Sequence, residues 1–163
     1  MVATLDLRSA PVISFNRMKP EHKIAVRCRA VILHEGKLLV VKHRPESAWY
    51  ALPGGHLEWG EGVQACLVRE IEEELGVRPE LGRLVYINTF VDAVSMTHSV
   101  EFFFEVVNGA AFTGERDLEA TDADEIAELR WVDSTDVVEL LPKQIAADFR
   151  QGKLPSDVVR YVG

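Results

Sequence analysis

Long hydrophobic runs are absent from this 163-residue sequence, in which apolar residues never extend beyond a few consecutive positions. A transmembrane helix needs about 20 predominantly apolar residues, so this pattern excludes one. The apolar residues near the N-terminus are interrupted by Asp6, Arg8 and Pro11, which leaves no hydrophobic region of signal-peptide length. We therefore expect a cytoplasmic protein that folds as one domain around its own core.

Cysteine is also scarce, because the chain contains only Cys28 and Cys66. Small domains that depend on disulfides usually carry several pairs, whereas 47% of the residues here are hydrophobic and can form a core. The sequence thus predicts no disulfide framework, and we expect both thiols to be reduced and buried.

Basic residues are outnumbered, with 18 Lys and Arg against 26 Asp and Glu, which gives a formal net charge of -8. The field of such a surface repels the phosphates of nucleic acids and of anionic lipids. We therefore expect neither a nucleic-acid partner nor a membrane partner.

Apolar and β-branched residues mark the expected strands. Residues 1–22 lack a sustained period and contain two prolines, so we interpret them as an arm or an extra edge strand. The run 101–105 is too apolar for a strand with one wet face, and we expect it to be central in a sheet. The first two strands are separated by His34-Glu35-Gly36, which predicts a hairpin. The predicted strands span residues 24–33, 37–41, 83–90, 99–107 and 129–132.

Three helices are expected between and after these strands. The first runs from about residue 62 to 75, with Gly76 in the usual position of a left-handed C-terminal cap. The second opens at Ser134 and stops at Pro142, and the third covers about 143–150. The order of elements predicts an α/β fold in which a mixed sheet is covered by helices on both faces. Residues 42–59 are rich in Pro and Gly and form a long loop between the second strand and the first helix.

Three carboxylates should converge on the first helix. Glu70, Glu73 and Glu74 are spaced i, i+3 and i+4, so they project from one narrow sector, whereas Glu72 points away. Like charges at this spacing repel one another, so a cation is needed to offset them. Mg²⁺ takes oxygen ligands and is typically held by carboxylates together with water and substrate phosphate. The pattern therefore predicts a Mg²⁺-phosphate site in an otherwise acidic protein.

The same segment resembles the Nudix box, G-x5-E-x7-R-E-U-x-E-E-x-G-U, where U is a bulky aliphatic residue. Every fixed position is matched, and with seven fixed identities a chance match in so short a chain is remote. The matching residues are Gly55, Glu61, Arg69, Glu70, Ile71, Glu73, Glu74, Gly76 and Val77. The resemblance implies the α/β/α sandwich of the Nudix hydrolase family over residues 23–163.

The resemblance also implies roles for individual residues around a bound Mg²⁺ or Mn²⁺. Glu73 and Glu74 would be the principal ligands, and Glu70 would be a ligand or the general base. Arg69 would orient the glutamates and, with Glu70 and Glu73, belong to the catalytic set. The implied metal-binding residues are Gly54, Gly55, Glu61, Glu70, Glu73 and Glu74.

Residues outside the box extend this expected site. Some family members recruit a glutamate from a loop before the last strand, and we prefer Glu125 over Glu128 as a base or extra ligand, although both also fit a solvated acidic stretch. Arg44 resembles the basic residue that often precedes a Trp-x-Leu-Pro-Gly-Gly pattern, which here contains one extra residue. We expect Arg44 to contact a phosphate and Trp49 to offer an aromatic platform for a base, a role that Phe90 could share.

The implied reaction is a pyrophosphohydrolysis, in which water attacks one phosphorus of a nucleoside diphosphate linked to another group. Signatures of several specialised subfamilies are absent. The leading substrate among those that the resemblance implies is a (d)NTP, with ADP-ribose or nucleotide sugars as alternatives. A nucleotide-sensing module that does not hydrolyse is a rival, although such modules often lose box glutamates that this chain keeps. An isomerase of isopentenyl diphosphate ranks lower, because its extra cysteine and glutamate lie in different surroundings. The arm leaves room for a homodimer, which the sequence neither supports nor excludes.

Overall fold

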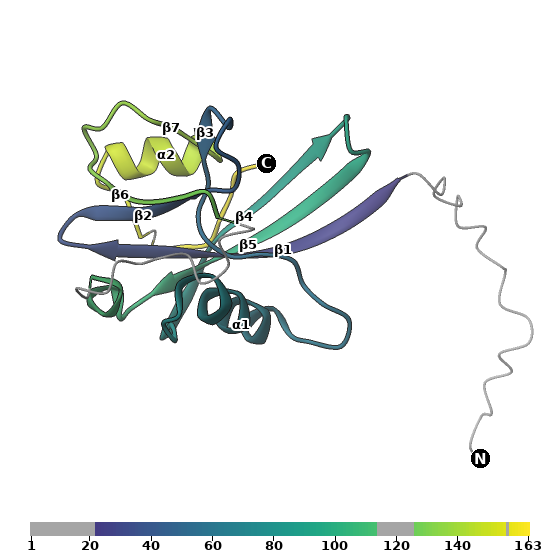
Figure 1. The fold of residues 1–163 in the computed structure, drawn as a ribbon, viewed down its shortest axis with the longest axis horizontal. Coiled ribbons are helices and arrows are strands. Elements are labelled where there is room, and N and C mark those ends of the chain that lie inside the picture. The colour runs from purple at the N-terminus through teal and green to yellow at the C-terminus, as the bar shows by residue number, and fades with distance from the viewer. Residues whose placement is uncertain (1–21, 114–125, 156) are drawn as a thin grey trace, which may run out of the picture.

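A computed structural model describes residues 22–113, 126–155 and 157–163 (Figure 1). The strands are β1 Lys23–His34, β2 Lys37–Lys42, β3 Trp49–Tyr50, β4 Leu81–Asp92, β5 Thr97–Val106, β6 Glu128–Val132, β7 Glu139–Leu140 and β8 Arg160–Tyr161. The α-helices of this part are α1 Val63–Leu75 and α2 Lys143–Arg150, and a 3₁₀ helix spans Gly109–Phe112. No helix in the described ranges is long and apolar enough to cross a membrane.

Six strands form a mixed sheet in the order β6-β2-β1-β5-β4-β8. The expected hairpin of β1 and β2 is confirmed, with antiparallel partners Leu33 and Leu38. Over the rest of its length β1 runs parallel to β5, from the pair Lys23 and Thr97 to the pair Ile32 and Val106. Because β5 lies between β1 and β4, the central position expected for the run 101–105 is also confirmed.

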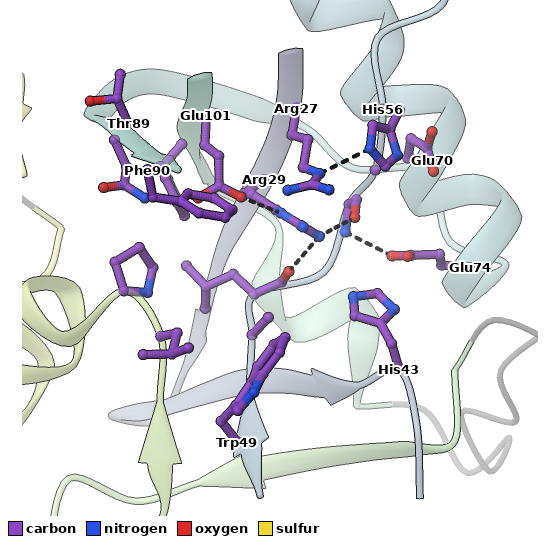
Figure 2. A pocket seen from close by; sticks show the side chains of 18 of the residues that line it. Arg27, Arg29, His43, Trp49, His56, Glu70, Glu74, Thr89, Phe90 and Glu101 are labelled. Atoms are coloured by element: carbon purple, nitrogen blue, oxygen red, sulfur yellow. Dashed lines mark hydrogen bonds and ion pairs between the residues drawn. The ribbon is translucent and has the colours of Figure 1, made fainter. Parts of the chain in front are cut away.

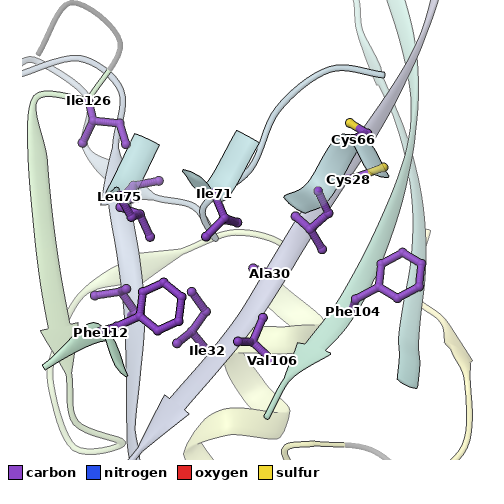
Figure 3. Packing of buried hydrophobic residues seen from close by; sticks show 13 residues of the cluster. Cys28, Ala30, Ile32, Cys66, Ile71, Leu75, Phe104, Val106, Phe112 and Ile126 are labelled. Atoms are coloured by element: carbon purple, nitrogen blue, oxygen red, sulfur yellow. The ribbon is translucent and has the colours of Figure 1, made fainter. Parts of the chain in front are cut away.

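Helices cover both faces of the sheet, as predicted (Figure 1). Alternate residues of β1 divide between two hydrophobic clusters, since Ala30 and Ile32 pack on the α1 side and Val31 on the α2 side. Figure 3 shows the first cluster, in which Cys28 and Cys66 are both buried and are free thiols, not joined in a disulfide. The helix residues that enter it are Cys66, Leu67, Ile71 and Leu75. The fold is therefore the α/β/α sandwich that the sequence predicts.

The helix of the glutamate cluster begins and ends where the sequence indicates. Its C-cap, Gly76, has φ of 66° and donates its backbone N–H to the carbonyl of Glu72 at 3.0 Å. Such a left-handed cap satisfies a carbonyl that the last turn would otherwise leave open.

The prediction of a helix that begins at Ser134 is wrong. Asp133 accepts hydrogen bonds from Thr135, and its carbonyl accepts the N–H of Asp136 at 3.0 Å, so this segment forms a turn. Further along this segment, Glu139–Leu140 form the short strand β7, which pairs in parallel with β3. Pro142 does not end a helix but precedes α2, whose bounds match the expected third helix. The expected N-terminal arm covers residues 1–22, and all of these except residue 22 lie outside the described residues.

Candidate active site

The loop that leads into α1 is fixed along the edge of β1. Three backbone hydrogen bonds of 2.9 Å join them: Cys28 N–H to Gly55 O, Ala30 N–H to Pro53 O, and Leu57 N–H to Val26 O. The loop therefore adds to the sheet like a short strand, which places Gly54 beside Glu74 and Gly55 beside Glu70 of α1.

The peptide groups of Gly54 are held from two sides. Its N–H donates to Glu74 Oε2 at 2.8 Å, and its carbonyl accepts a hydrogen bond from Arg29 Nη1. The residue has φ of 121°, and a Cβ here would lie 2.2 Å from the carbonyl oxygen of Cys28. Only glycine fits both the conformation and the space.

Gly55 lies directly against the carboxylate of Glu70. A Cβ at this position would lie 2.2 Å from Glu70 Oε2, so the missing side chain is what admits the carboxylate. The Gly55 carbonyl accepts the N–H of Cys28, and a carbonyl oxygen has a second lone pair for another partner.

Arg69 joins most of the acidic side chains of the box. Its Nη1 donates to Glu70 Oε1 and to Glu73 Oε2, both at 3.0 Å, and its Nη2 donates to Glu61 Oε1 at 2.7 Å. Nη2 also donates to the carbonyl of His56 at 3.1 Å, which ties the loop to the helix. These bonds correspond to the orienting role that the sequence suggests for Arg69.

The electrostatics of this cluster follow from the same contacts. The hydrogen bonds from Arg69 and from the backbone of Glu58 lower the pKa of Glu61 to about 2, so that carboxylate is ionised at neutral pH. In return, Glu61 is the largest of the influences that raise the pKa of the Arg69 guanidinium.

The carboxylates of Glu70 and Glu73 converge, because each lies 3.0 Å from the same nitrogen of Arg69. Glu74 is 3% exposed, and its Oε2 accepts the Gly54 N–H, while the residue lines the same cavity as Glu70 and Glu73. The described residues contain no group of three or more His, Cys, Asp or Glu side chains arranged as a metal site. The convergent oxygen donors of Glu70 and Glu73 nevertheless suit a hard divalent cation.

These groups line one large cavity of about 1110 Å³ (Figure 2). The expected site residues on its wall are Arg44, Trp49, Gly54, Gly55, Arg69, Glu70, Glu73 and Glu74. Trp49 is half-exposed, and Figure 2 shows its ring in the cavity across from Phe90. The cavity thus brings together the box glutamates, a basic residue and two aromatic rings.

The two candidate glutamates before the last strand have different outcomes. Glu125 lies outside the described residues. Glu128 accepts a hydrogen bond from Tyr50 Oη at 2.7 Å and pairs with Lys42 Nζ at 3.3 Å, and it is not part of the cavity wall. The pKa of Glu128 is lowered, and the hydrogen bond from Tyr50 is the largest cause.

Sequence reasoning missed a polar network on the sheet side of the cavity. Arg29 Nε donates to Glu101 Oε1 at 3.3 Å, and Asn88 Nδ2 donates to Glu101 Oε2 at 2.9 Å. Arg27 and His56 line the same side of the cavity. The pKa of His56 is lowered, mainly by burial and next by the positive charge of Arg27. A signal was present, because arginines at two alternate positions of an otherwise apolar strand point to one face.

The sequence model of the NUDIX domain matches residues 21–152, and the chain therefore belongs to the Nudix hydrolase family. Members of this family generally use divalent metal ions and act on small-molecule nucleotides.

Individual relatives agree with this assignment. The chain is 34% identical over 100 residues to an ADP-ribose pyrophosphatase of Methanocaldococcus jannaschii, a match that covers 59% of each chain. It is 38% identical over 72 residues to a MutT-like protein of Streptomyces ambofaciens, over 43% of this chain and 46% of that protein. The matches thus span only about half the length of these curated relatives. A crystal structure of a MutT NUDIX hydrolase from Burkholderia pseudomallei aligns with a TM-score of 0.64 and 30% identity, over 80% of this chain and 98% of that one.

Proposed function

We propose that this protein is a divalent-metal-dependent pyrophosphohydrolase that cleaves a nucleoside diphosphate linked to another group. The observation that carries the proposal is the convergence of Glu70 and Glu73 on Arg69 Nη1, at the wall of a cavity of about 1110 Å³. A (d)NTP, which would give a nucleoside monophosphate and pyrophosphate, is the leading substrate. ADP-ribose is the second candidate, because a 34% identical relative is named for that activity.

Glu70 and Glu73 would hold the metal, Mg²⁺ or Mn²⁺, with Gly55 offering its carbonyl oxygen. When bound, such a cation lowers the pKa of a coordinated water and neutralises charge on the phosphates. Glu74 and Glu61 would stabilise this arrangement, because Glu74 accepts a hydrogen bond from the Gly54 N–H and Glu61 accepts one from Arg69.

The remaining steps belong to side chains of the chain itself. A carboxylate accepts the proton of the attacking water, and the candidates are Glu125, with Glu70 as a metal ligand, or Glu70 itself in place of that ligand role. The water oxygen forms a bond to one phosphorus, and the bond from that phosphorus to the bridging oxygen breaks. Arg44 would contact a phosphate, and Trp49 would stack against the base.

A hydrolysis screen tests this function. Native protein with Mg²⁺ or Mn²⁺ is incubated with (d)NTPs, oxidised (d)NTPs, ADP-ribose, nucleotide sugars, NADH and dinucleoside polyphosphates. Glu73→Gln is the test variant, and Glu72→Gln is the matched control, because Glu72 lies on the same helix but bonds to Arg78.

The proposal predicts metal-dependent release of a monophosphate by the native protein and by Glu72→Gln, and its collapse in Glu73→Gln. If native protein binds a nucleotide but hydrolyses none of these compounds, the protein is a sensing module and the proposed function is wrong.

A further inference from the structure

Arg27 is a cation on the sheet side of the cavity, and it has no role in the reaction proposed above. It lies on β1, next to His56 in Figure 2, and its side chain is partly buried. His56 connects it to the glutamates, because the imidazole contacts Arg27 while the carbonyl of the same residue accepts a bond from Arg69.

Neutral groups hold the guanidinium in place. Its Nε donates to His56 Nε2 at 3.0 Å, and its Nη1 donates to Ser99 Oγ at 3.0 Å. The guanidinium carbon lies 5.7 Å from the centre of the Phe90 ring, within the range of a cation–π interaction. These three contacts fix the orientation of the side chain before any ligand binds.

Unlike Arg29 and Arg69 in the same cavity, Arg27 forms no ion pair with a carboxylate of the described residues. Arg29 pairs with Glu101 at 3.3 Å, and Arg69 pairs with three glutamates. The third nitrogen of Arg27, Nη2, donates no hydrogen bond to any residue in the described ranges. An orientationally fixed guanidinium, with one nitrogen that bonds to none of the described residues, therefore lines the cavity.

A partly buried guanidinium that forms no ion pair of its own is costly, so an anion that binds to it in the cavity would be stabilised. Burial, and then the charge of Arg29, lower the pKa of Arg27, and the charges of Glu101 and Asp92 act against this shift. Guanidinium groups match the geometry of phosphate oxygens, whereas the protein as a whole, at a net charge of -8, repels phosphates. Local positive charge is therefore needed to bind a diphosphate.

We propose that Arg27 binds a phosphate oxyanion of the substrate, and that it holds the diphosphate from the side of the sheet while the glutamates of α1 act from the other side. The inference rests on the proposed function, which supplies a substrate with a diphosphate.

The test uses inorganic pyrophosphate as the probe, with binding to the full chain measured by calorimetry in Mg²⁺. Arg27→Gln is the test variant, and Arg83→Gln is the control, because Arg83 is a half-exposed arginine that pairs with Glu105 away from the cavity. Loss of one charge-assisted hydrogen bond should weaken pyrophosphate binding about ten- to hundredfold in Arg27→Gln. The control should bind as the native protein does. In turnover, KM should rise by a similar factor while kcat changes less.

Equal affinity for pyrophosphate in native protein and folded Arg27→Gln would overturn the inference, as would a native protein that does not bind pyrophosphate. A loss in kcat alone would also overturn it, because it would indicate that Arg27 only positions His56. If Arg27→Gln does not fold, Arg27→Lys decides, since its single ammonium should bind pyrophosphate at least about threefold more weakly than the native guanidinium. If pyrophosphate binding depends on Arg27 but no substrate is hydrolysed, the proposed function fails and this inference stands.

Discussion

Replacement of Gly55 by alanine should inactivate the site and leave the fold intact. The new Cβ would lie 2.2 Å from Glu70 Oε2 and 2.4 Å from Glu70 Cδ, far inside van der Waals contact. The carboxylate must therefore move by about 1 Å, and a displacement of that size can cost about a hundredfold in rate. We expect kcat/KM of Gly55→Ala to fall by about that factor.

The free energy of unfolding should change little in the same variant. The clash is with the end of a flexible side chain, and the backbone at Gly55 lies outside the region that L side chains avoid. A weakened hydrogen bond to Glu70 costs about 1 kcal/mol, and the lower entropy of the unfolded chain offsets part of it. Gly54→Ala is the contrasting variant, because its Cβ would lie 2.2 Å from the backbone oxygen of Cys28 at φ of 121°. We expect Gly54→Ala to lose about 2 kcal/mol or more.

Urea unfolding and steady-state kinetics on the two variants measure both quantities. Gly62→Ser is the control, because nothing lies within 4 Å of the new Cβ and serine is a good helix N-cap. Activity in Gly55→Ala within threefold of native, or a loss of stability equal to that of Gly54→Ala, would refute the reasoning.

Three further predictions concern stability, the metal and the thiols. Asp148 is 2% exposed, and although burial opposes it, bonds from Arg160 and from Tyr86 lower its pKa below 3.8. Asp148→Asn should therefore lower the free energy of unfolding by about 2–3 kcal/mol at pH 7, measured by urea unfolding. This difference from native protein should shrink as the pH falls below 3.8 through the lowered pKa of Asp148. A difference that stays constant with pH would contradict the assignment. EDTA should abolish hydrolysis and added Mg²⁺ or Mn²⁺ should restore it, so activity that survives chelation would count against a metal site. Burial raises the pKa of both Cys28 and Cys66, so neither should react with a thiol reagent at pH 8 until denaturant is added, and rapid labelling of folded protein would show that they are accessible.

The helix of the box could be predicted from sequence because its information is local. Periodic apolar residues, the carboxylates at i, i+3 and i+4, and Gly76 at the C-terminus all act within a few residues of one another. The hairpin and the central β5 were predictable for the same reason, from a Gly-containing turn and from an apolar run.

Tertiary partners decide what could not be predicted. The spacing places Glu74 on one side of the helix with Glu70 and Glu73, but it gives no sign that Glu74 accepts the N–H of Gly54, twenty residues earlier in the chain. The segment after Ser134 has helical spacing, but pairing with β3 makes part of it a strand. Likewise, the carboxylate partner of Arg29 is Glu101, which lies 72 residues away and meets it through the parallel pairing of β1 with β5.

Binding of Mn²⁺ tests directly whether the convergent carboxylates of Glu70 and Glu73 hold a divalent cation. Electron paramagnetic resonance of free Mn²⁺ would be followed during titration of native protein, Glu73→Gln and Glu72→Gln. We expect a bound ion in native protein and in Glu72→Gln, and binding at least about tenfold weaker in Glu73→Gln. Equal binding in all three proteins would contradict this expectation.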